Sequence, residues 1–193
     1  MTKERLLAFS DGVIAILITI MVLELKAPEE ADWHALRPLL PVFASYVLSF
    51  VFLGIYWNNH HHMLQMTERV NGKILWANMH LLFWLSLTPF VTAWLGQVGV
   101  KPLPTALYGM VLLLSGISYT VLQFSIIADQ GPGSRLAAVV GRDIKGKTSA
   151  LLYAAAVPMA FVLPLVSVAV YVVMAVWWLV PDRRIERHLM GQS

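Results

Sequence analysis

The sequence predicts an all-α integral membrane protein, from its apolar composition, its few charges and its long apolar runs. Of its 193 residues, 58% are hydrophobic and only 13% are charged. A soluble domain holds about 45–50% apolar and about 25% charged residues. A chain with this composition has too little polar surface to cover a water-soluble globule. We therefore expect most of it to be surrounded by lipid. We find no second soluble domain and expect one transmembrane domain over residues 1–193.

The apolar runs predict six membrane spans, because a transmembrane helix needs about 20 mostly apolar residues. They fall at residues 5–26, 39–60, 73–96, 105–128, 148–163 and 164–180. The last two share one apolar stretch, which Pro158 and Pro164 divide. Proline removes a backbone donor and suits the first turn of a new helix. Each of these two helices is short, so tilting or local thinning of the bilayer is needed.

The charges alternate between the two sides of this arrangement. One side holds Lys3, Arg5, Arg69, Lys73, Arg135, Arg142, Lys145, Lys147, Arg183, Arg184 and Arg187, and the other holds Lys26, Arg37 and Lys101 with Glu29, Glu30 and Asp32. Basic residues collect in cytoplasmic loops, so both termini are predicted to be cytoplasmic. Merging the last two spans would move the C-terminal arginines outside, which favours six spans. We expect the loop basics Arg142, Lys145 and Lys147 to touch anionic headgroups.

Several chemistries are excluded or disfavoured. There is no cysteine, which excludes disulfides, thiolate zinc sites and cysteine nucleophiles. The consecutive His60, His61 and His62 point in different helical directions and make a poor metal site. An interfacial cap is the favoured interpretation of these histidines, and a pH-sensitive contact is the alternative. We expect no metal, no cofactor, no nucleic-acid partner and no enzymatic activity.

The first span carries the most informative pattern. Its run at residues 6–25 is longer than the apolar region of a signal peptide, and no A-x-A-like cleavage site follows. At 100° per residue one stripe of the helix holds Phe9, Gly12, Ile16, Ile20 and Leu23, with Thr19 on its shoulder. Asp11 lies nearly opposite, towards other helices of the same subunit or of a neighbour. A carboxylate inside a span is costly and needs a partner or water.

The spacing leaves two interpretations of this stripe open. Its apolar residues face an axis shared by several copies, where they stack as rings about 5 Å apart, or they serve ordinary helix packing and lipid contact. In the first case Ser10 and Asp11 anchor the rear of the helix through hydrogen bonds. Glu24, at the outer end, either attracts cations or is simply solvated.

A family resemblance lies in the same helix. Arg5-Leu-Leu-Ala-Phe9-Ser10-Asp11 fits an R-x-x-x-F-S-D pattern and is followed by Gly-Val-Ile-Ala15-Ile16, Thr19, Ile20, Leu23 and Pro28. This resembles the first helix of the transmembrane protein 175 family, which comprises the lysosomal potassium channel and its bacterial relatives. Trp76-Ala-Asn78-Met-His80 and Leu87-Thr-Pro89-Phe90 resemble that family's third helix.

The resemblance implies a potassium-permeable channel in a bacterial inner membrane, with the lipid bilayer, potassium ions and further copies of the chain as partners. Helix one of each subunit in a homotetramer would line the pore, with its constriction at Ile16 and further rings at Ile20 and Leu23. Thr19 would hold a hydrated ion or fix the pore geometry. No T-V-G-Y-G filter is present, and the one Tyr-Gly pair, Tyr108-Gly109, lies inside an apolar span.

The remaining polar residues allow more than one role. We expect a network of Arg5, Ser10, Asp11 and His80 that fixes helix one against helix three, with Asn78 and Trp76 as further candidate partners of Asp11. An ordinary core histidine is the alternative for His80. The competing function is a secondary transporter or proton-coupled carrier that uses Asp11 and His80 as a relay, although such carriers usually show broken helices and internal repeats.

Overall fold

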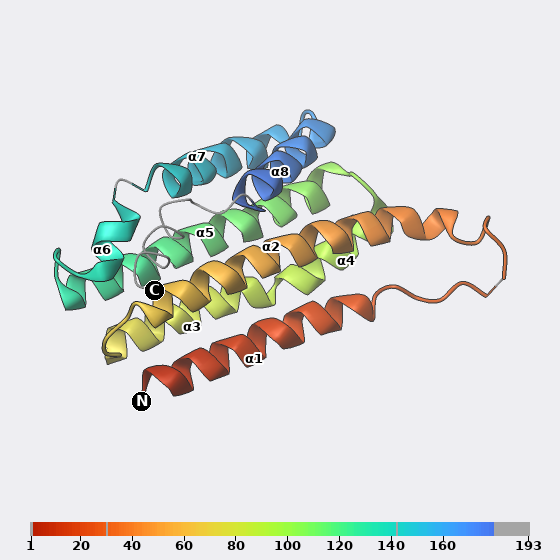
Figure 1. The fold of residues 1–193 in the computed structure, drawn as a ribbon. Coiled ribbons are helices and arrows are strands. Elements are labelled where there is room, and N and C mark those ends of the chain that lie inside the picture. The colour runs from red at the N-terminus through yellow and green to blue at the C-terminus, as the bar shows by residue number, and fades with distance from the viewer. Residues whose placement is uncertain (1, 30, 142, 180–193) are drawn as a thin grey trace.

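The computed structural model describes residues 2–29, 31–141 and 143–179, and it is helical throughout its regular parts (Figure 1). The elements are α1 (Lys3–Val22), the 3₁₀ turn η1 (Arg37–Leu39), α2 (Leu40–Gln65), α3 (Gly72–Ser86), α4 (Thr88–Val98), α5 (Pro102–Gln130), α6 (Arg135–Val140), α7 (Ile144–Met159) and α8 (Pro164–Leu179). The long helices lie side by side along one direction, and α8 folds back beside α7. The all-α prediction is confirmed.

Four segments of the described chain are long and apolar enough to cross a membrane. They are Lys3–Val22, Arg37–Gln65, Gly72–Val98 and Pro102–Gln130. The remaining two predicted spans correspond to α7 and α8, of 16 residues each. At about 1.5 Å per residue each covers about 24 Å, less than the hydrocarbon thickness of about 30 Å. Four spans therefore stand on length and composition, and six spans remain a prediction.

The break between α7 and α8 follows the prolines as predicted. Pro158 lies in the last turn of α7, and α8 begins at Pro164. The Ser167 hydroxyl donates to the Ala156 carbonyl oxygen over 2.7 Å and ties the two helices together. A second break, within the predicted span 73–96, was not expected. It falls at Leu87, whose N–H turns back to the Trp84 carbonyl; Pro89 lies in the first turn of α4 and has no N–H to continue the ladder of α3.

Several helix ends differ from the predicted bounds, and those of α1 and α2 bear on the placement of polar residues. α1 ends at Val22, four residues before the predicted end, and the next N–H groups make i→i−3 bonds. α2 runs to Gln65, five residues beyond the predicted end at His60. The three histidines therefore lie inside the helix. Apolar composition locates a span but does not mark where its backbone ladder stops.

The interior divides into two apolar clusters. One joins α1, α2, α3 and α5 and includes Leu6, Ile14 and Leu81. The other joins α2, α4, α5, α7 and α8 around Tyr108 and Tyr171, whose rings lie 5.7 Å apart. α8 approaches α5 at a glycine: a Cβ on Gly109 would overlap the Tyr171 hydroxyl. That absence of a side chain lets Tyr171 donate to the Thr105 carbonyl oxygen over 3.2 Å.

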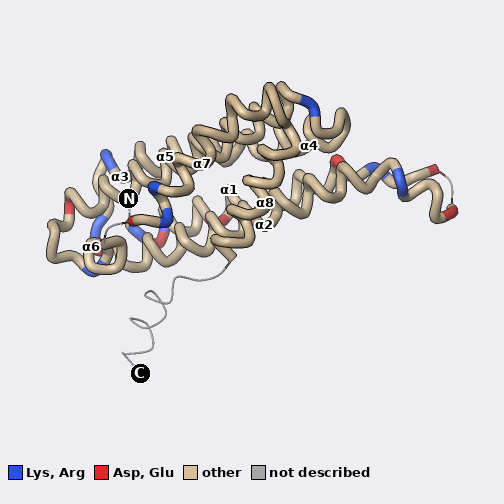
Figure 2. Tube along the Cα trace, turned by 90° about the horizontal axis from the view of Figure 1, so that it is seen from above, with Lys and Arg blue, Asp and Glu red and all other residues tan. Residues whose placement is uncertain are grey.

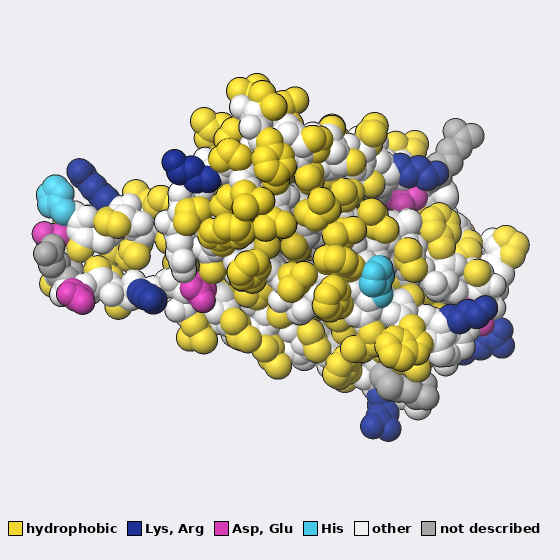
Figure 3. All heavy atoms as spheres, turned by 180° about the vertical axis from the view of Figure 1, so that it is seen from behind, with side chains coloured by type: hydrophobic (Ala, Val, Ile, Leu, Met, Phe, Trp, Pro, Cys, Tyr) yellow, Lys and Arg dark blue, Asp and Glu magenta, His cyan; other side chains and the backbone are white. Residues whose placement is uncertain are grey.

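Lysines and arginines gather towards the two ends of the bundle (Figure 2). One end holds the described basic residues Lys3, Arg5, Arg69, Lys73, Arg135, Lys145 and Lys147, and the loop at the other end mixes both signs. Arg142, Arg183, Arg184, Arg187 and Glu30, which belong to the predicted charge pattern, lie outside the described residues. A space-filling view shows apolar side chains over most of one face, with Lys and Arg towards its ends (Figure 3).

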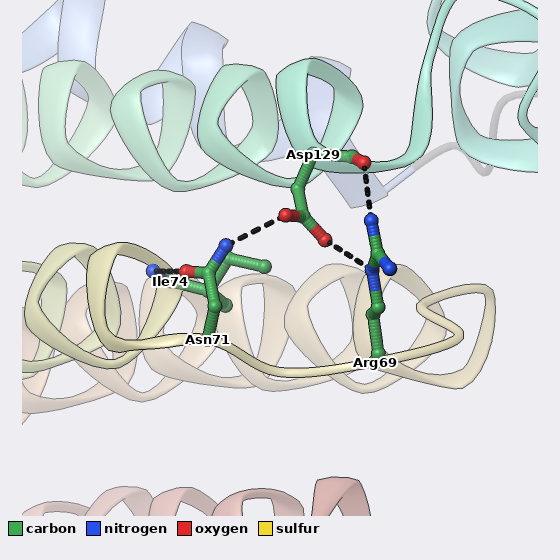
Figure 4. A network of polar contacts seen from close by, with 4 residues as sticks. All are labelled: Arg69, Asn71, Ile74 and Asp129. Carbon is green, nitrogen blue, oxygen red and sulfur yellow. Dashed lines mark hydrogen bonds and ion pairs between the residues drawn. The ribbon is translucent and has the colours of Figure 1, made fainter.

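At the basic end, hydrogen bonds and an ion pair from Arg69 and Asn71 to Asp129 join the α2–α3 connection to the end of α5 (Figure 4). We call this group of contacts the clasp. The Asp129 carboxylate accepts from Arg69 Nε over 2.9 Å and from Asn71 Nδ2 over 2.7 Å. Arg69 also donates to the Asp129 carbonyl, and Asn71 Oδ1 caps α3 by accepting from the Ile74 N–H. The clasp therefore fixes the start of α3 against α5.

Candidate functional site

α1 has one buried face and one exposed face within the subunit. The buried residues are Leu6, Ser10, Ile14, Leu17 and Met21. The predicted stripe lies on the other side, where Phe9, Gly12, Ile16, Ile20 and Leu23 are exposed. Ile16 is 56% exposed and Ile20 is 44% exposed, although both occupy a helix that is otherwise packed against α2, α3 and α4. A complete face of this helix is thus available to lipid or to other copies.

Thr19 and Leu23 are placed differently from the isoleucines. Thr19 is exposed, and its hydroxyl donates to the Ile16 carbonyl oxygen over 2.9 Å. Its hydroxyl oxygen keeps free acceptor capacity on the exposed side. Leu23 lies one residue beyond α1, at the C-cap. The stripe therefore has its one hydroxyl between Ile16 and Ile20, and its last apolar residue on a turn.

A buried chain of polar groups holds α1 to the two neighbouring helices. Asn78 Nδ2 donates to the Ser10 hydroxyl over 3.0 Å, and Asn78 Oδ1 lies 2.7 Å from His60 Nε2. Ser10 in turn donates to the Leu6 carbonyl over 2.9 Å. All three side chains are completely buried. Because the amide nitrogen of Asn78 is a donor to Ser10, its oxygen must accept, and His60 carries its proton on Nε2.

Asp11 faces α2 of its own subunit. Its Oδ1 accepts from Trp57 Nε1 over 3.0 Å, and its Oδ2 lies 3.7 Å from His61 Nδ1. The Trp57 and His61 rings lie 5.8 Å apart, on successive turns of α2. The carboxylate is partly exposed, so it has a partner and access to water together.

The predicted network of Arg5, Ser10, Asp11 and His80, which was to fix helix one against helix three, is wrong in three of its members. Only Ser10 contacts α3, whereas Asp11 contacts Trp57 and His61 of α2. His80 is exposed, and its Nε2 accepts from Trp84 Nε1 on its own helix. The reason is helical geometry, since His80 follows Asn78 by two residues and points about 200° away from it. Asn78 therefore occupies the position that faces Ser10. Arg5 is exposed, and its guanidinium has no hydrogen-bond or ion-pair partner among the described residues.

The interfacial cap predicted for the histidine run is also wrong for His60. Its side chain is fully buried against Asn78 because α2 continues past it to Gln65. Only His61 and His62 keep partial exposure. No signal in the sequence singles out His60, because it lies among Asn58, Asn59, His61 and His62.

Neither Glu24 nor the histidines form a site built for a cation. Glu24 lies exposed just beyond α1 and accepts from Gln97 Nε2 of α4 over 3.3 Å. Among the described residues, no group of three or more His, Asp or Glu side chains is arranged to hold a metal ion. The polar groups of α1 therefore hold the helix in place, and its exposed face is the feature left for function.

Comparison with known proteins identifies this arrangement. Residues 5–89 match the family model of the endosomal/lysosomal potassium channel TMEM175. A protein named as a potassium channel from Chryseobacterium sp. (strain P1-3) is 49% identical over 98% of each chain. The chain belongs to the TMEM175 family. A second TMEM175 relative, named as a potassium channel from Streptomyces collinus, is 35% identical over 61% of each chain.

A solved structure agrees with the TMEM175 fold. The crystal structure of a lysosomal potassium-selective channel TMEM175 homologue from Chamaesiphon minutus superposes with a TM-score of 0.80. It is 26% identical and covers 91% of this chain and 95% of that one. The residues matched by the TMEM175 family model, 5–89, run from α1 to the start of α4. They include the whole buried chain of Ser10, Asn78 and His60. The resemblance inferred from the first helix is confirmed, and the chain is a multi-pass membrane protein of a channel family.

Proposed function

We propose that this chain is a potassium-permeable channel whose pore is formed by α1 of each subunit. The observation that carries the proposal is the exposed face of α1, which Ile16 and Ile20 occupy while the opposite face is packed and hydrogen-bonded. A helix that only filled space beside α2 and α3 would need no such regular stripe. The bacterial relatives named as potassium channels support the ion.

The constriction is a set of apolar rings. Copies of Ile16 and Ile20 around a common axis form rings one turn apart, about 5–6 Å along the pore. Leu23 adds a third ring at the outer end. A narrow apolar ring expels water and so removes the hydration of an ion, which closes the pore by dewetting. Opening then requires a small outward movement or rotation of α1.

Ion preference in this pore does not depend on a filter of backbone carbonyls. No T-V-G-Y-G run occurs in the sequence, and the carbonyls of α1 are used in its own helical bonds. Thr19 supplies a hydroxyl oxygen between the isoleucine rings and faces the hydrated ion. Selectivity for potassium over sodium is accordingly weaker than in channels whose carbonyls replace the hydration shell.

The assembly is a homotetramer of six-span subunits in a bacterial inner membrane, with residues 1–193 as one transmembrane domain and both termini cytoplasmic. In support, most of the described basic residues gather at the end where α1 begins, and basic residues favour the cytoplasmic side. α8 turns back beside α7, which directs the chain towards the same end. The short α7 and α8 cross by tilting or by thinning the bilayer.

The carrier alternative is not favoured, because Asp11 and His80 have separate hydrogen-bond partners and no contact joins them among the described residues. Asp11 is engaged by Trp57 of α2, whereas His80 is engaged by Trp84 and exposed on α3. A proton relay requires groups within hydrogen-bonding reach, directly or through one water. The break at Leu87 is a feature that transporter helices also show.

The decisive experiment is passive flux from purified protein in potassium-loaded liposomes. We compare the wild type with Ile16→Asn, and with Leu151→Asn as a control for the same change at an exposed apolar position of α7. The channel proposal expects potassium flux above sodium flux, raised or reshaped by Ile16→Asn and unchanged by Leu151→Asn. The absence of passive flux from correctly assembled protein would refute the channel proposal. Equal flux in the wild type and in Ile16→Asn would mean that the stripe serves ordinary helix packing or lipid contact.

A further inference from the structure

A long groove runs between α3, α5 and α7 on the side of the subunit that α1 does not line. Its volume is about 1310 Å³. Its polar end is formed by Asn71, Lys73, Asp129, Asp143 and Lys147, and its apolar part by Trp76, Ile117, Val121 and Phe124. Polar and apolar lining are thus separated along its length, as the two parts of an amphiphile are.

The polar end presents two exposed lysines, of which Lys73 also acts electrostatically on the Asp129 carboxylate. Lys73 and Lys147 are exposed there, and neither has a hydrogen bond or an ion pair with any described residue. The carboxylates beside them are already engaged: Asp129 accepts from Arg69 and Asn71, and Asp143 accepts from the Gly146 N–H as the cap of α7. The groove therefore offers two lysines to an anion from outside the subunit.

The apolar part has the length of one acyl chain. On α5, Ile117, Val121 and Phe124 follow one another by about one turn, and all three are exposed. Asp129 lies twelve residues after Ile117, so the groove extends about 18 Å from its polar end. Half of a bilayer's hydrocarbon core is about 15 Å thick. A lipid chain that starts at the level of the lysines reaches Ile117 near the middle of the membrane.

We propose that this groove binds one anionic glycerophospholipid, with its phosphate group between Lys73 and Lys147 and an acyl chain along α5 against Trp76. The lipid comes from the leaflet at the basic end of the bundle. A second copy of the chain fits less well, because the equivalent end of α1 carries Lys3 and Arg5. Those residues would meet Lys73 and Lys147 as like charges.

The first test measures lipid that stays with the protein. Wild-type protein is placed in nanodiscs of equal phosphatidylglycerol and phosphatidylcholine, extracted gently, and its retained lipids are counted by native mass spectrometry. The wild type retains phosphatidylglycerol in preference. One lysine near an anionic surface contributes about a fivefold preference, so the double variant K73Q/K147Q loses about thirtyfold. Lys101→Gln, at the opposite end of α5, is the matched control and retains the lipid.

A second test locates the chain of the lipid and does not depend on charge. A photo-crosslinking amino acid replaces Phe124, whose side chain is half exposed in the groove. A lipid adduct after illumination, lost on adding Val121→Trp to fill the groove, supports the proposal. An adduct to another protein chain overturns it, as does equal retention of phosphatidylcholine. Unchanged retention in K73Q/K147Q, or an equal loss in Lys101→Gln, also overturns it.

Discussion

The side chain of Asn78 donates to the Ser10 hydroxyl over 3.0 Å and thereby joins α3 to α1 inside an apolar cluster. Its other end faces His60 of α2 at 2.7 Å. One amide thus connects three helices, and its two hydrogen bonds have no competition from water because all three side chains are buried. The helix that we propose to line the pore is held at its rear by this residue.

Removing that amide should destabilise the subunit. Asn78→Ala leaves the His60 Nε2–H and one acceptor site of Ser10 without partners, and each unsatisfied buried group costs about 1–3 kcal/mol. We expect a clearly lower unfolding temperature in detergent, measured by near-ultraviolet circular dichroism. His80→Ala, two residues along the same helix and exposed, is the matched control and should change little. Equal losses in both variants would contradict the role given to Asn78.

The contact between Asp11 and Trp57 should appear as an energetic coupling. Because the bond is partly exposed, we expect a coupling of about 1 kcal/mol between Trp57→Phe and Asp11→Ala in a double-mutant cycle. Unfolding free energies of the two single variants and the double variant give this number. The same cycle with Trp76→Phe, a tryptophan on α3 away from Asp11, should be additive. Additivity in both cycles would remove the contact as an anchor of α1.

Gly109 should not tolerate even one methyl group. Gly109→Ala forces Tyr171 and with it α8 away from α5, and overpacking of this kind typically costs about 1–3 kcal/mol. Gly116→Ala is a control on the same helix, since its added Cβ would meet the Tyr56 hydroxyl at 3.7 Å, an ordinary contact. Thermal unfolding should separate the two variants. A Gly109→Ala protein as stable as Gly116→Ala would show that α8 is loosely held.

The absence of cysteine allows the exposed face of α1 to be tested one residue at a time. Single cysteines at Ile16, Thr19 and Ile20 should react with a charged thiosulfonate reagent in reconstituted protein, because a thiolate forms only where water reaches it. A cysteine at the buried Ile14 and one at the exposed Leu151 of α7 should not react. Equal inertness of the stripe and of Leu151 would assign the stripe to lipid.

Much of the fold followed from the sequence because apolar length and charge alternation are strong signals in a membrane protein. The runs around α1, α2 and α5 located spans, and Pro158 and Pro164 located the break before α8. The break at Leu87 was missed because its flanking residues are as apolar as the rest of the run, although Pro89 marked it. Helix ends were less predictable, since a few polar residues can continue a helix, as the histidines of α2 do.

The site was predicted in part. The exposed stripe and the rear position of Ser10 and Asp11 follow from a period of 3.6 residues. The partners of these residues do not, because a contact between helices depends on how each is rotated about its axis. A choice between Asn78 and His80 rests on that rotation alone, and the sequence favoured His80 by depth in the membrane. The pairing of Ser10 with Asn78 required the packed helices.

The uncharged stretch of α1 has an electrical consequence. From Gly12 to its end at Val22, α1 carries no Asp, Glu, Lys or Arg, and its charged residues Lys3, Glu4, Arg5 and Asp11 all lie in its first half. A transmembrane voltage performs about 2.3 kcal/mol of work per 100 mV only on a charge that crosses the whole field. A small outward movement of α1 carries none of these charges through it. Movement of α1 therefore transfers almost no gating charge, so opening should depend little on membrane voltage. Current through the open pore should rise in proportion to the driving force.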